Sequence, residues 1–259
     1  MITLRLAALA LCAAVSCSVC AAPLVTVEVM GSVRTPGALT LPSGSRLSDA
    51  ALAGAPDEHS YLLGAALLRR SELVAQTRLK TGLLFDLELL ESRASVDPDG
   101  AAAAGRIAGD LSAMPVTGRI VQMLSPRALE MDLSSNRPLV DGDRLYYPSR
   151  PNTVTVLGAV ERPCSITHRP LQQPLDYARH CTVLAAANQD DLFVIQPDGK
   201  IERLGIALWN RSPSSALAPG ALIYVPLNAK ALRNVNPDFN EDAARFLATQ
   251  ALDAPGAPK

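Results

Sequence analysis

A pattern of residues that recurs 127 positions further along the chain, so that Gly31 corresponds to Gly158, constrains the fold more than any other feature. Every spacing is kept without a gap between Val27, Val29, Gly31, Val33, Pro36, Leu39 and Asp49 in the first copy and Val154, Val156, Gly158, Val160, Pro163, Ile166 and Asp176 in the second. Such self-similarity indicates one structural unit used twice. The chain is therefore predicted to contain two similar modules in tandem.

Each copy opens with the residues of a β-hairpin. Valines alternate with polar residues over positions 25–29, which is the period of a half-buried strand. Pro36 and Gly37 supply a turn, after which the alternation resumes. Residues 48–53 are predicted to form a short helix, ended by Gly54 as a residue free to take a positive φ.

The two copies end alike but differ in length. The first ends with Leu139, Gly142, Leu145, Tyr146 and Pro148, which match Leu217, Gly220, Ile223, Tyr224 and Pro226 in the second. Gly31 and Gly142 are 111 positions apart, whereas Gly158 and Gly220 are 62 apart. The first copy therefore carries an insertion of about 49 residues.

The insertion, at about residues 60–113, is predicted to be a helical hairpin. Apolar residues fall mostly three or four positions apart over residues 65–92, as in an amphipathic helix. Asp-Pro-Asp-Gly at 97–100 breaks the pattern, and residues 101–113 can return as a second helix. We expect this hairpin either to protrude from the first module or to lie across it.

The second module continues with another hairpin, and a final helix follows it. Residues 192–196 and 201–207 flank the turn sequence Pro-Asp-Gly-Lys at 197–200. Residues 237–252 are predicted to form the final helix. The chain is thus an α+β protein with a first module at 22–150, a second at 151–228, and a C-terminal helix and tail at 229–259.

Residues 1–21 have the features of a signal peptide. A basic residue precedes an apolar run of about ten residues, whereas a membrane-spanning helix needs roughly 20. Cleavage is expected between Ala21 and Ala22, and lipidation at Cys17 or Cys20 is a weaker alternative because no leucine stands three positions upstream of either. The mature chain is expected to be exported and to have no transmembrane anchor.

Cys164 and Cys181 would remain after cleavage, and two cysteines in an oxidising compartment are predicted to form a disulfide. The loop they close spans 17 positions, to which chain-entropy arguments assign about 3 kcal/mol. A zinc site formed with His168 and His180 is an alternative, although the spacing is not that of a familiar zinc module. A thiol nucleophile would require the disulfide to be absent.

The formal net charge of −1 and the absence of a basic run argue against nucleic acid as a partner. No arrangement of residues suggests catalysis. His59 lies in a polar connection with nothing nearby to orient it, and the adjacent carboxylates of Asp190 and Asp191 point to different faces, as a solvated loop would have them. We therefore expect a protein that is not an enzyme and uses no cofactor and no metal.

Several motifs resemble those of a known family. The first copy resembles a soluble-ligand-binding β-grasp module through Gly31-Ser32-Val33, Pro36-Gly37 and Leu47-Ser48-Asp49-Ala50. The whole is similar to the GfcC-type capsule biosynthesis family through Val116-Thr117-Gly118-Arg119, Asp141-Gly142-Asp143, Gly158-Ala159-Val160, Gln196-Pro197-Asp198-Gly199 and Trp209-Asn210. The likeness covers roughly residues 22–252.

The resemblance implies two tandem β-grasp domains, a helical insertion in the first, and a C-terminal helix. It also implies a periplasmic protein of a Gram-negative bacterium without known enzymatic activity, which assists capsule or exopolysaccharide assembly or export. Its partners would be the surface polysaccharide, proteins of the outer-membrane export machinery, or both. A periplasmic enzyme acting on polysaccharide and a lipid-anchored, pore-forming exporter are the alternatives.

Arg119 is the candidate for ligand contact in the first module, because it follows a glycine at the entry to a strand and a guanidinium suits anionic sugars or phosphates. An ordinary surface arginine is the alternative. The final helix would present Phe239, Phe246 and Leu247 on its apolar face. These three are candidates for partner binding, with packing on their own domain as the alternative.

Overall fold

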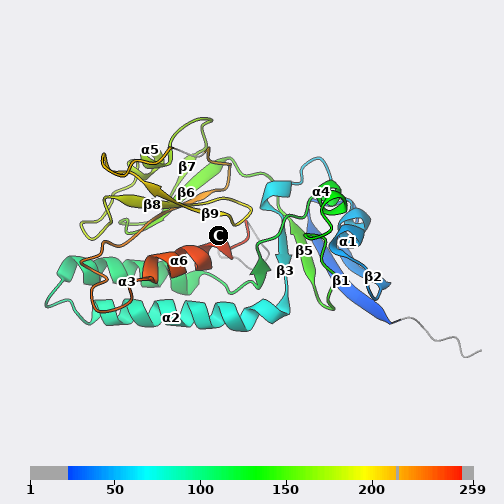
Figure 1. Ribbon diagram of the computed structural model, residues 1–259, viewed down its shortest axis with the longest axis horizontal. Coiled ribbons are helices and arrows are strands. Elements are labelled where there is room, and N and C mark those ends of the chain that lie inside the picture. The colour runs from blue at the N-terminus through cyan, green and yellow to red at the C-terminus, as the bar shows by residue number, and fades with distance from the viewer. Residues whose placement is uncertain (1–22, 214–215, 253–259) are drawn as a thin grey trace, which may run out of the picture.

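The computed structural model describes residues 23–213 and 216–252. The predicted signal peptide, with its cleavage point between Ala21 and Ala22, lies outside these residues. The first module consists of β1 (Leu24–Gly31), β2 (Gly37–Pro42), α1 (Leu47–Gly54), β3 (Ala66–Leu68), β4 (Arg119–Ile120), α4 (Pro126–Met131) and β5 (Arg144–Tyr147). Its strands form one sheet in the order β2-β1-β5-β3-β4, with β1 parallel to β5 (Figure 1).

The second module repeats this plan. Its elements are β6 (Thr153–Gly158), β7 (Cys164–Thr167), α5 (Pro174–Ala178), β8 (Asp191–Ile195), β9 (Ile201–Gly205) and β10 (Leu222–Val225). The strand order is β7-β6-β10-β8-β9, and β6 is parallel to β10. A hairpin, a helix and a last strand parallel to the first make each module a β-grasp, so the repeat and the α+β fold class are confirmed.

The alternation of valines in the first hairpin sets its register. Val25, Val27 and Val29 are buried beneath α1, and Val27 lies opposite Leu39. The helix α1 ends differently from the prediction, because Ala55 takes the left-handed conformation, with a φ of 50°. Gly54 serves close packing instead, since a Cβ there would lie 2.6 Å from Cγ1 of Val29.

The inserted hairpin consists of α2 (Leu73–Glu91) and α3 (Pro98–Ala113), which pack against each other. The prediction of helix over residues 65–92 is wrong at its beginning. Short 3-10 turns occupy Leu62–Gly64 and Arg70–Glu72, and β3 between them is fully buried beside β5. The insertion therefore joins β3 to β4, where the second module has only the turn between β8 and β9.

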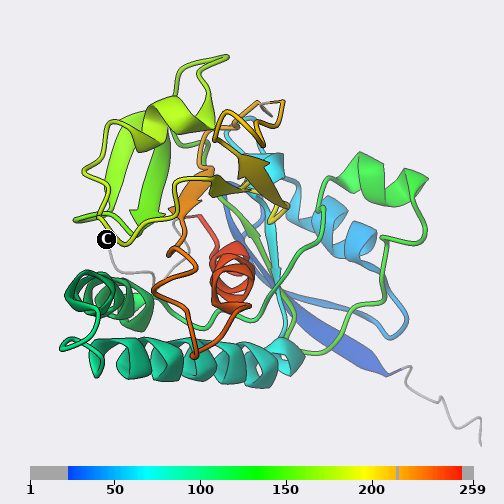
Figure 2. The same ribbon diagram turned by 60° about the vertical axis from the view of Figure 1, so that its left-hand side comes forward.

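The hairpin lies against the second module and covers the C-terminal helix α6 (Phe239–Ala248), as Figures 1 and 2 show. Leu83, Leu87 and Leu90 of α2 belong to the same hydrophobic core as the second sheet and α6. The helix α6 thus lies between the second sheet and a helical layer contributed by the first module. Among the described residues, no helix is long and apolar enough to cross a membrane.

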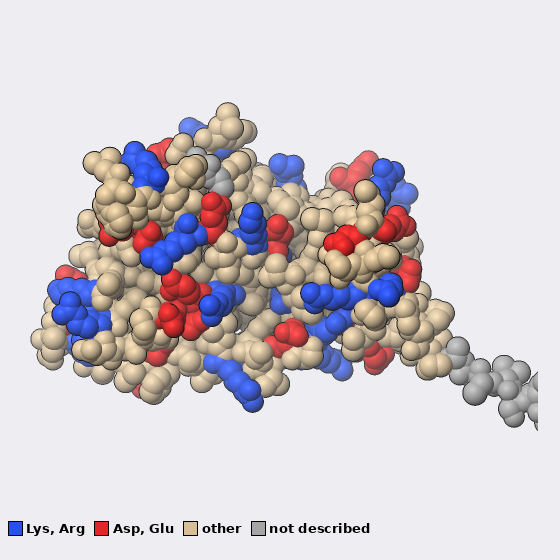
Figure 3. All heavy atoms as spheres, viewed as in Figure 1, with Lys and Arg blue, Asp and Glu red and all other residues tan. Residues whose placement is uncertain are grey.

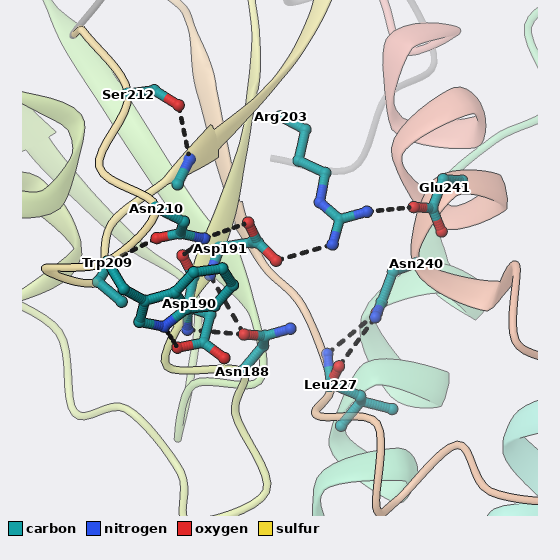
Figure 4. Close-up of polar contacts among 12 residues, drawn as sticks. Asn188, Asp190, Asp191, Arg203, Trp209, Asn210, Ser212, Leu227, Asn240 and Glu241 are labelled. Atoms are coloured by element: carbon teal, nitrogen blue, oxygen red, sulfur yellow. Dashed lines mark hydrogen bonds and ion pairs between the residues drawn. The ribbon is translucent and has the colours of Figure 1, made fainter.

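Buried polar groups fix α6 in this position. The side-chain oxygen of Asn240 accepts hydrogen bonds from the Tyr224 hydroxyl at 3.1 Å and from the backbone N–H of Leu227 at 3.0 Å. Its Nδ2 donates to the carbonyl oxygen of Leu227 at 2.8 Å (Figure 4). Because an unpaired buried amide is costly, these bonds select one placement of the helix on the sheet.

Candidate functional site

Arg119, the predicted ligand contact, begins β4 and is only 4% exposed. Its Nη1 donates to the carbonyl oxygen of Gln250 at 2.6 Å, and its Nη2 donates to that of Pro197. Burial lowers the pKa of Arg119 to about 10, and the charge of Asp198 opposes that effect. The guanidinium lines a cavity of about 160 Å³ and ties β4 to the end of α6 and to the β8–β9 turn. Ligand contact by Arg119 stays a prediction.

Phe239, Phe246 and Leu247, the predicted partner-binding residues, are fully buried on α6. They pack in the core that the second sheet shares with the inserted hairpin. A partner would reach them only if α6 left the sheet. In this arrangement they pack on their own domain, and partner binding by them stays a prediction.

The two cysteines form the predicted disulfide, which links the start of β7 to the segment after α5. The zinc alternative thereby loses both thiolate ligands, and the two histidines contact separate carbonyl oxygens. Nε2 of His168 lies 2.8 Å from the oxygen of Leu217, and Nδ1 of His180 lies 2.6 Å from that of Asp176. In the described part of the chain, no group of three or more His, Cys, Asp and Glu side chains is placed to hold a metal ion.

Residues 206–212, which follow β9, display two adjacent apolar side chains to solvent, and we call them the tryptophan loop. Leu208 is 89% exposed and Trp209 is 77% exposed. Nε1 of Trp209 donates to Oδ1 of Asp190 at 3.3 Å, which orients the indole (Figure 4). Single exposed apolar residues are common, so what distinguishes this loop is that two of them are adjacent and that one ring is held by a hydrogen bond.

Hydrogen bonds brace the tryptophan loop from within. Oδ1 of Asn210 accepts from the N–H of Ala207 at 3.1 Å, and Nδ2 donates to the carbonyl oxygen of Asp190 at 3.1 Å. Ser212 closes the loop, because its N–H donates to the carbonyl oxygen of Gly205 at 3.0 Å and its Oγ accepts from the N–H of Gly205 at 3.2 Å. A Cβ at Gly205 would collide with the backbone of Asn210. The loop is therefore held in one conformation before any ligand arrives.

An ion-pair network beside the loop joins β8, β9 and α6. Nη2 of Arg203 lies 2.7 Å from Oδ2 of Asp191, and Nη1 lies 3.1 Å from Oε1 of Glu241. Asp191 also accepts from Nδ2 of Asn210 at 3.2 Å, which connects the network to the tryptophan loop (Figure 4). The hydrogen bond to Asp191 raises the pKa of Arg203.

The network borders a cavity of about 400 Å³, which we call the network cavity. Asn188 stands at its edge, and its Oδ1 accepts from the N–H groups of Asp190 at 2.7 Å and of Asp191 at 3.2 Å. Asp190 lies in the loop that precedes β8, as predicted, whereas Asp191 begins β8. Both carboxylates position other side chains, the indole in one case and Arg203 in the other.

The two neighbouring aspartates do not have the arrangement of a glycosidase pair. Two catalytic carboxylates must flank the scissile bond, whereas Asp190 and Asp191 are neighbours that hold different side chains. Figure 3 shows acidic and basic residues interspersed over the face seen in Figure 1, without an extended patch of one sign. A braced indole beside polar side chains suits a partly polar ligand with an apolar face.

Sequence reasoning noted Trp209 and Asn210 only as part of a resemblance, and it missed the surface that they form. The signal was a single tryptophan placed outside any predicted strand or helix. Its partner Asp190 is 19 positions earlier in the chain, and Glu241 is 38 positions after Arg203. Pairings at such separations depend on the fold of the module.

Comparisons with known proteins agree with this architecture. Residues 23–150 match the family model for the N-terminal part of capsule biosynthesis protein GfcC, and residues 163–251 match the model for its C-terminal part. The chain is also similar to the uncharacterized protein YjbG of Escherichia coli (strain K12), with 31% identity over 212 residues, which cover 81% of this chain and 84% of that protein. The chain therefore belongs to the GfcC family of capsule biosynthesis proteins.

Proposed function

We propose that this protein is a non-catalytic periplasmic component of capsule or exopolysaccharide assembly, and that it binds the polysaccharide at the tryptophan loop. The observation that carries the proposal is the exposure of Trp209 on a loop braced by Asn210 and Ser212. Membership of a capsule biosynthesis family supports a role in capsule or exopolysaccharide assembly. The exposed, braced indole supports polysaccharide as the ligand.

A sugar ring matches the chemistry of this surface. One face of a pyranose carries C–H groups that can lie on an indole, while its hydroxyls need hydrogen-bond partners. Asp190 provides a carboxylate next to the ring, and Asn188, which contacts Asp190, provides an amide that also lines the network cavity. Because the loop is already ordered, binding costs little conformational entropy.

The arrangement gives less support to the alternatives. For an enzyme, the carboxylates near Trp209 are engaged in hydrogen bonds or ion pairs, and His59 is exposed beside Glu58 in the other module. For a pore-forming exporter, the helix that would line the pore is α6, whose Phe239 and Phe246 are in the core. Leu208 and Trp209 could instead contact an export protein, and the following experiment distinguishes that alternative from polysaccharide binding.

Equilibrium binding of polysaccharide fragments from the producing bacterium tests the proposal. We expect Trp209→Ala to weaken binding about tenfold or more, which corresponds to about 1.4 kcal/mol. Phe85→Ala is the matched control, because Phe85 is an exposed aromatic residue on α2 in the inserted hairpin. Because hydrolysis of a glycosidic bond creates a new reducing end, we expect no new reducing ends after the fragments are incubated with the protein.

Equal binding by Trp209→Ala and the wild type would reject the tryptophan loop as the glycan site. The appearance of new reducing ends would instead reject the non-catalytic assignment. If Trp209→Ala lost an export protein from a crosslinked complex and kept the glycan, the loop would be a protein-docking surface.

A further inference from the structure

A second cavity, of about 400 Å³, lies on the second module and shares residues with the tryptophan loop. One wall is formed by α5 and the residues next to it, and the other by the end of β9 with Ile206, Arg211 and Ser212. Leu175 and Leu204 supply apolar lining. We call this space the arginine cavity, after Arg179 and Arg211.

The charges of the arginine cavity differ from those of the network cavity. In the network cavity, Arg203 is neutralised by two carboxylates at 2.7 and 3.1 Å. The arginine cavity has two guanidinium groups and one carboxylate, and its only ion pair is a long one, with 3.8 Å between Nη1 of Arg179 and Oδ1 of Asp176. Arg211 forms no ion pair with any residue that the structure describes. One positive charge is therefore left without a counterpart in the lining.

The hydrogen bonds that brace the tryptophan loop also brace the cavity wall that carries Arg211. Ser212, the next residue, is fixed by its two hydrogen bonds to Gly205, and Asn210 on the other side is fixed by Asp190 and Asp191. The backbone that carries Arg211 is therefore held between two braced residues. Trp209 and Arg211 stand two positions apart on this one braced segment.

We infer that the arginine cavity binds an acidic substituent, a carboxylate or a phosphate, on a sugar residue of the polysaccharide that stacks on Trp209. This inference rests on the proposed function, and it adds the chemical class of the ligand. An apolar lining suits a sugar ring, and a guanidinium donates paired hydrogen bonds to a carboxylate or phosphate. A cavity of this volume falls within the range of small-molecule sites, which begins at about 300 Å³.

The test compares matched ligands and matched variants in equilibrium binding. The ligands are the native polysaccharide fragment, the same fragment after its carboxyl groups are reduced to alcohols, and the same fragment after its phosphate groups are removed. The variants are Arg211→Gln and Arg179→Gln, with Arg162→Gln as the control because Arg162 is an exposed arginine at the β6–β7 turn, outside the cavity lining.

We expect Arg211→Gln to weaken binding of the native fragment about tenfold or more, as expected for the loss of a hydrogen bond to a charged group. Arg162→Gln should leave binding unchanged. The treatment that removes the acidic group from the fragment should weaken wild-type binding to a similar degree. The wild type and Arg211→Gln should then bind that treated fragment equally. Whichever treatment does so identifies the group as carboxylate or phosphate.

Equal wild-type affinity for the native and both treated fragments would overturn the inference, as would an affinity of Arg211→Gln equal to that of Arg162→Gln. If Trp209→Ala abolished binding under those conditions, the glycan site would stand and only its acidic specificity would fail. If binding depended on Arg211 but not on Trp209, the acidic subsite would stand and the stacking surface would fail.

Discussion

Arg119 could be singled out from the sequence, but the residues that its side chain contacts could not be predicted. It directly follows Gly118, which has a φ of 72° in the structure. The carbonyl oxygens that it contacts belong to residues 78 and 131 positions away. A cation at the C-terminal end of a helix is favourable, and Arg119 donates to the chain just beyond α6.

Removal of the Arg119 guanidinium should destabilise the protein. In Arg119→Met the carbonyl oxygens of Pro197 and Gln250 lose their buried partner, so we expect the free energy of unfolding to fall by about 2–4 kcal/mol. Chemical denaturation measures this change. Arg127→Met, at an exposed arginine of α4, is the control and should change stability by less than about 0.5 kcal/mol. Equal stability of the two variants would contradict the role given to Arg119.

Asn210 is the residue on which the tryptophan loop depends. In Asn210→Ala the loop loses bonds to Ala207, Asp190 and Asp191, so we expect a more mobile indole and weaker glycan binding. The variant should resemble Trp209→Ala in affinity, although the indole is retained. Phe85→Ala, which removes an exposed aromatic side chain of α2 far from the loop in sequence, is the control and should keep full affinity. Full affinity in Asn210→Ala would show that preorganisation of the loop does not matter.

At the scale of elements, the sequence predicted what periodicity and turn chemistry determine. The β1–β2 and β6–β7 hairpins, the β8–β9 hairpin and both inserted helices were expected from pattern. The strand β3 was missed, because Ala66, Leu67 and Leu68 form a short apolar run that continues the helical spacing of α2. A fully buried strand has no polar alternation, so only its pairing with β5 distinguishes it from a buried helical turn.

The disulfide connects the β6–β7 hairpin to the segment after α5, and its removal should weaken the second module. A Cys164→Ser, Cys181→Ser double variant is expected to lose about 3 kcal/mol of unfolding free energy, because its unfolded chain is no longer closed into a loop. Denaturant titration of wild type, with and without reductant, provides the comparison. An unchanged midpoint, together with two free thiols in wild type from its native compartment, would contradict the pairing.

At the scale of the molecule, the inserted hairpin makes the second module dependent on the first. The structure inserts it between β3 and β4 of one sheet and packs it on the helix that covers the other. Nδ2 of Asn236 donates to Asp86 at 2.7 Å, and Nη1 of Arg93 donates to the carbonyl oxygen of Arg233 at 2.6 Å. The sequence predicted the hairpin but not its position, since an amphipathic face does not identify the surface that it covers.

Shortening a buried side chain of the inserted hairpin should therefore destabilise the second module. Leu87→Ala is expected to cost about 2–5 kcal/mol and to reduce amide hydrogen-exchange protection in α6, β8 and β10, with less effect in β1 and β2. Phe85→Ala is the control on the same helix, because Phe85 is 58% exposed whereas Leu87 is fully buried. Loss of protection confined to the first module would show that the two modules are energetically independent.

The central claim, that polysaccharide binds at the tryptophan loop, can be tested through the fluorescence of Trp209, the single tryptophan of the chain. The indole is 77% exposed in the free protein, so its emission should be that of a solvated ring and readily quenched by acrylamide. We predict that added polysaccharide fragments shift the emission to shorter wavelength and protect the ring from acrylamide, in a saturable manner that Asn210→Ala weakens. Saturable binding of the same fragments with no change in emission or quenching would contradict the claim.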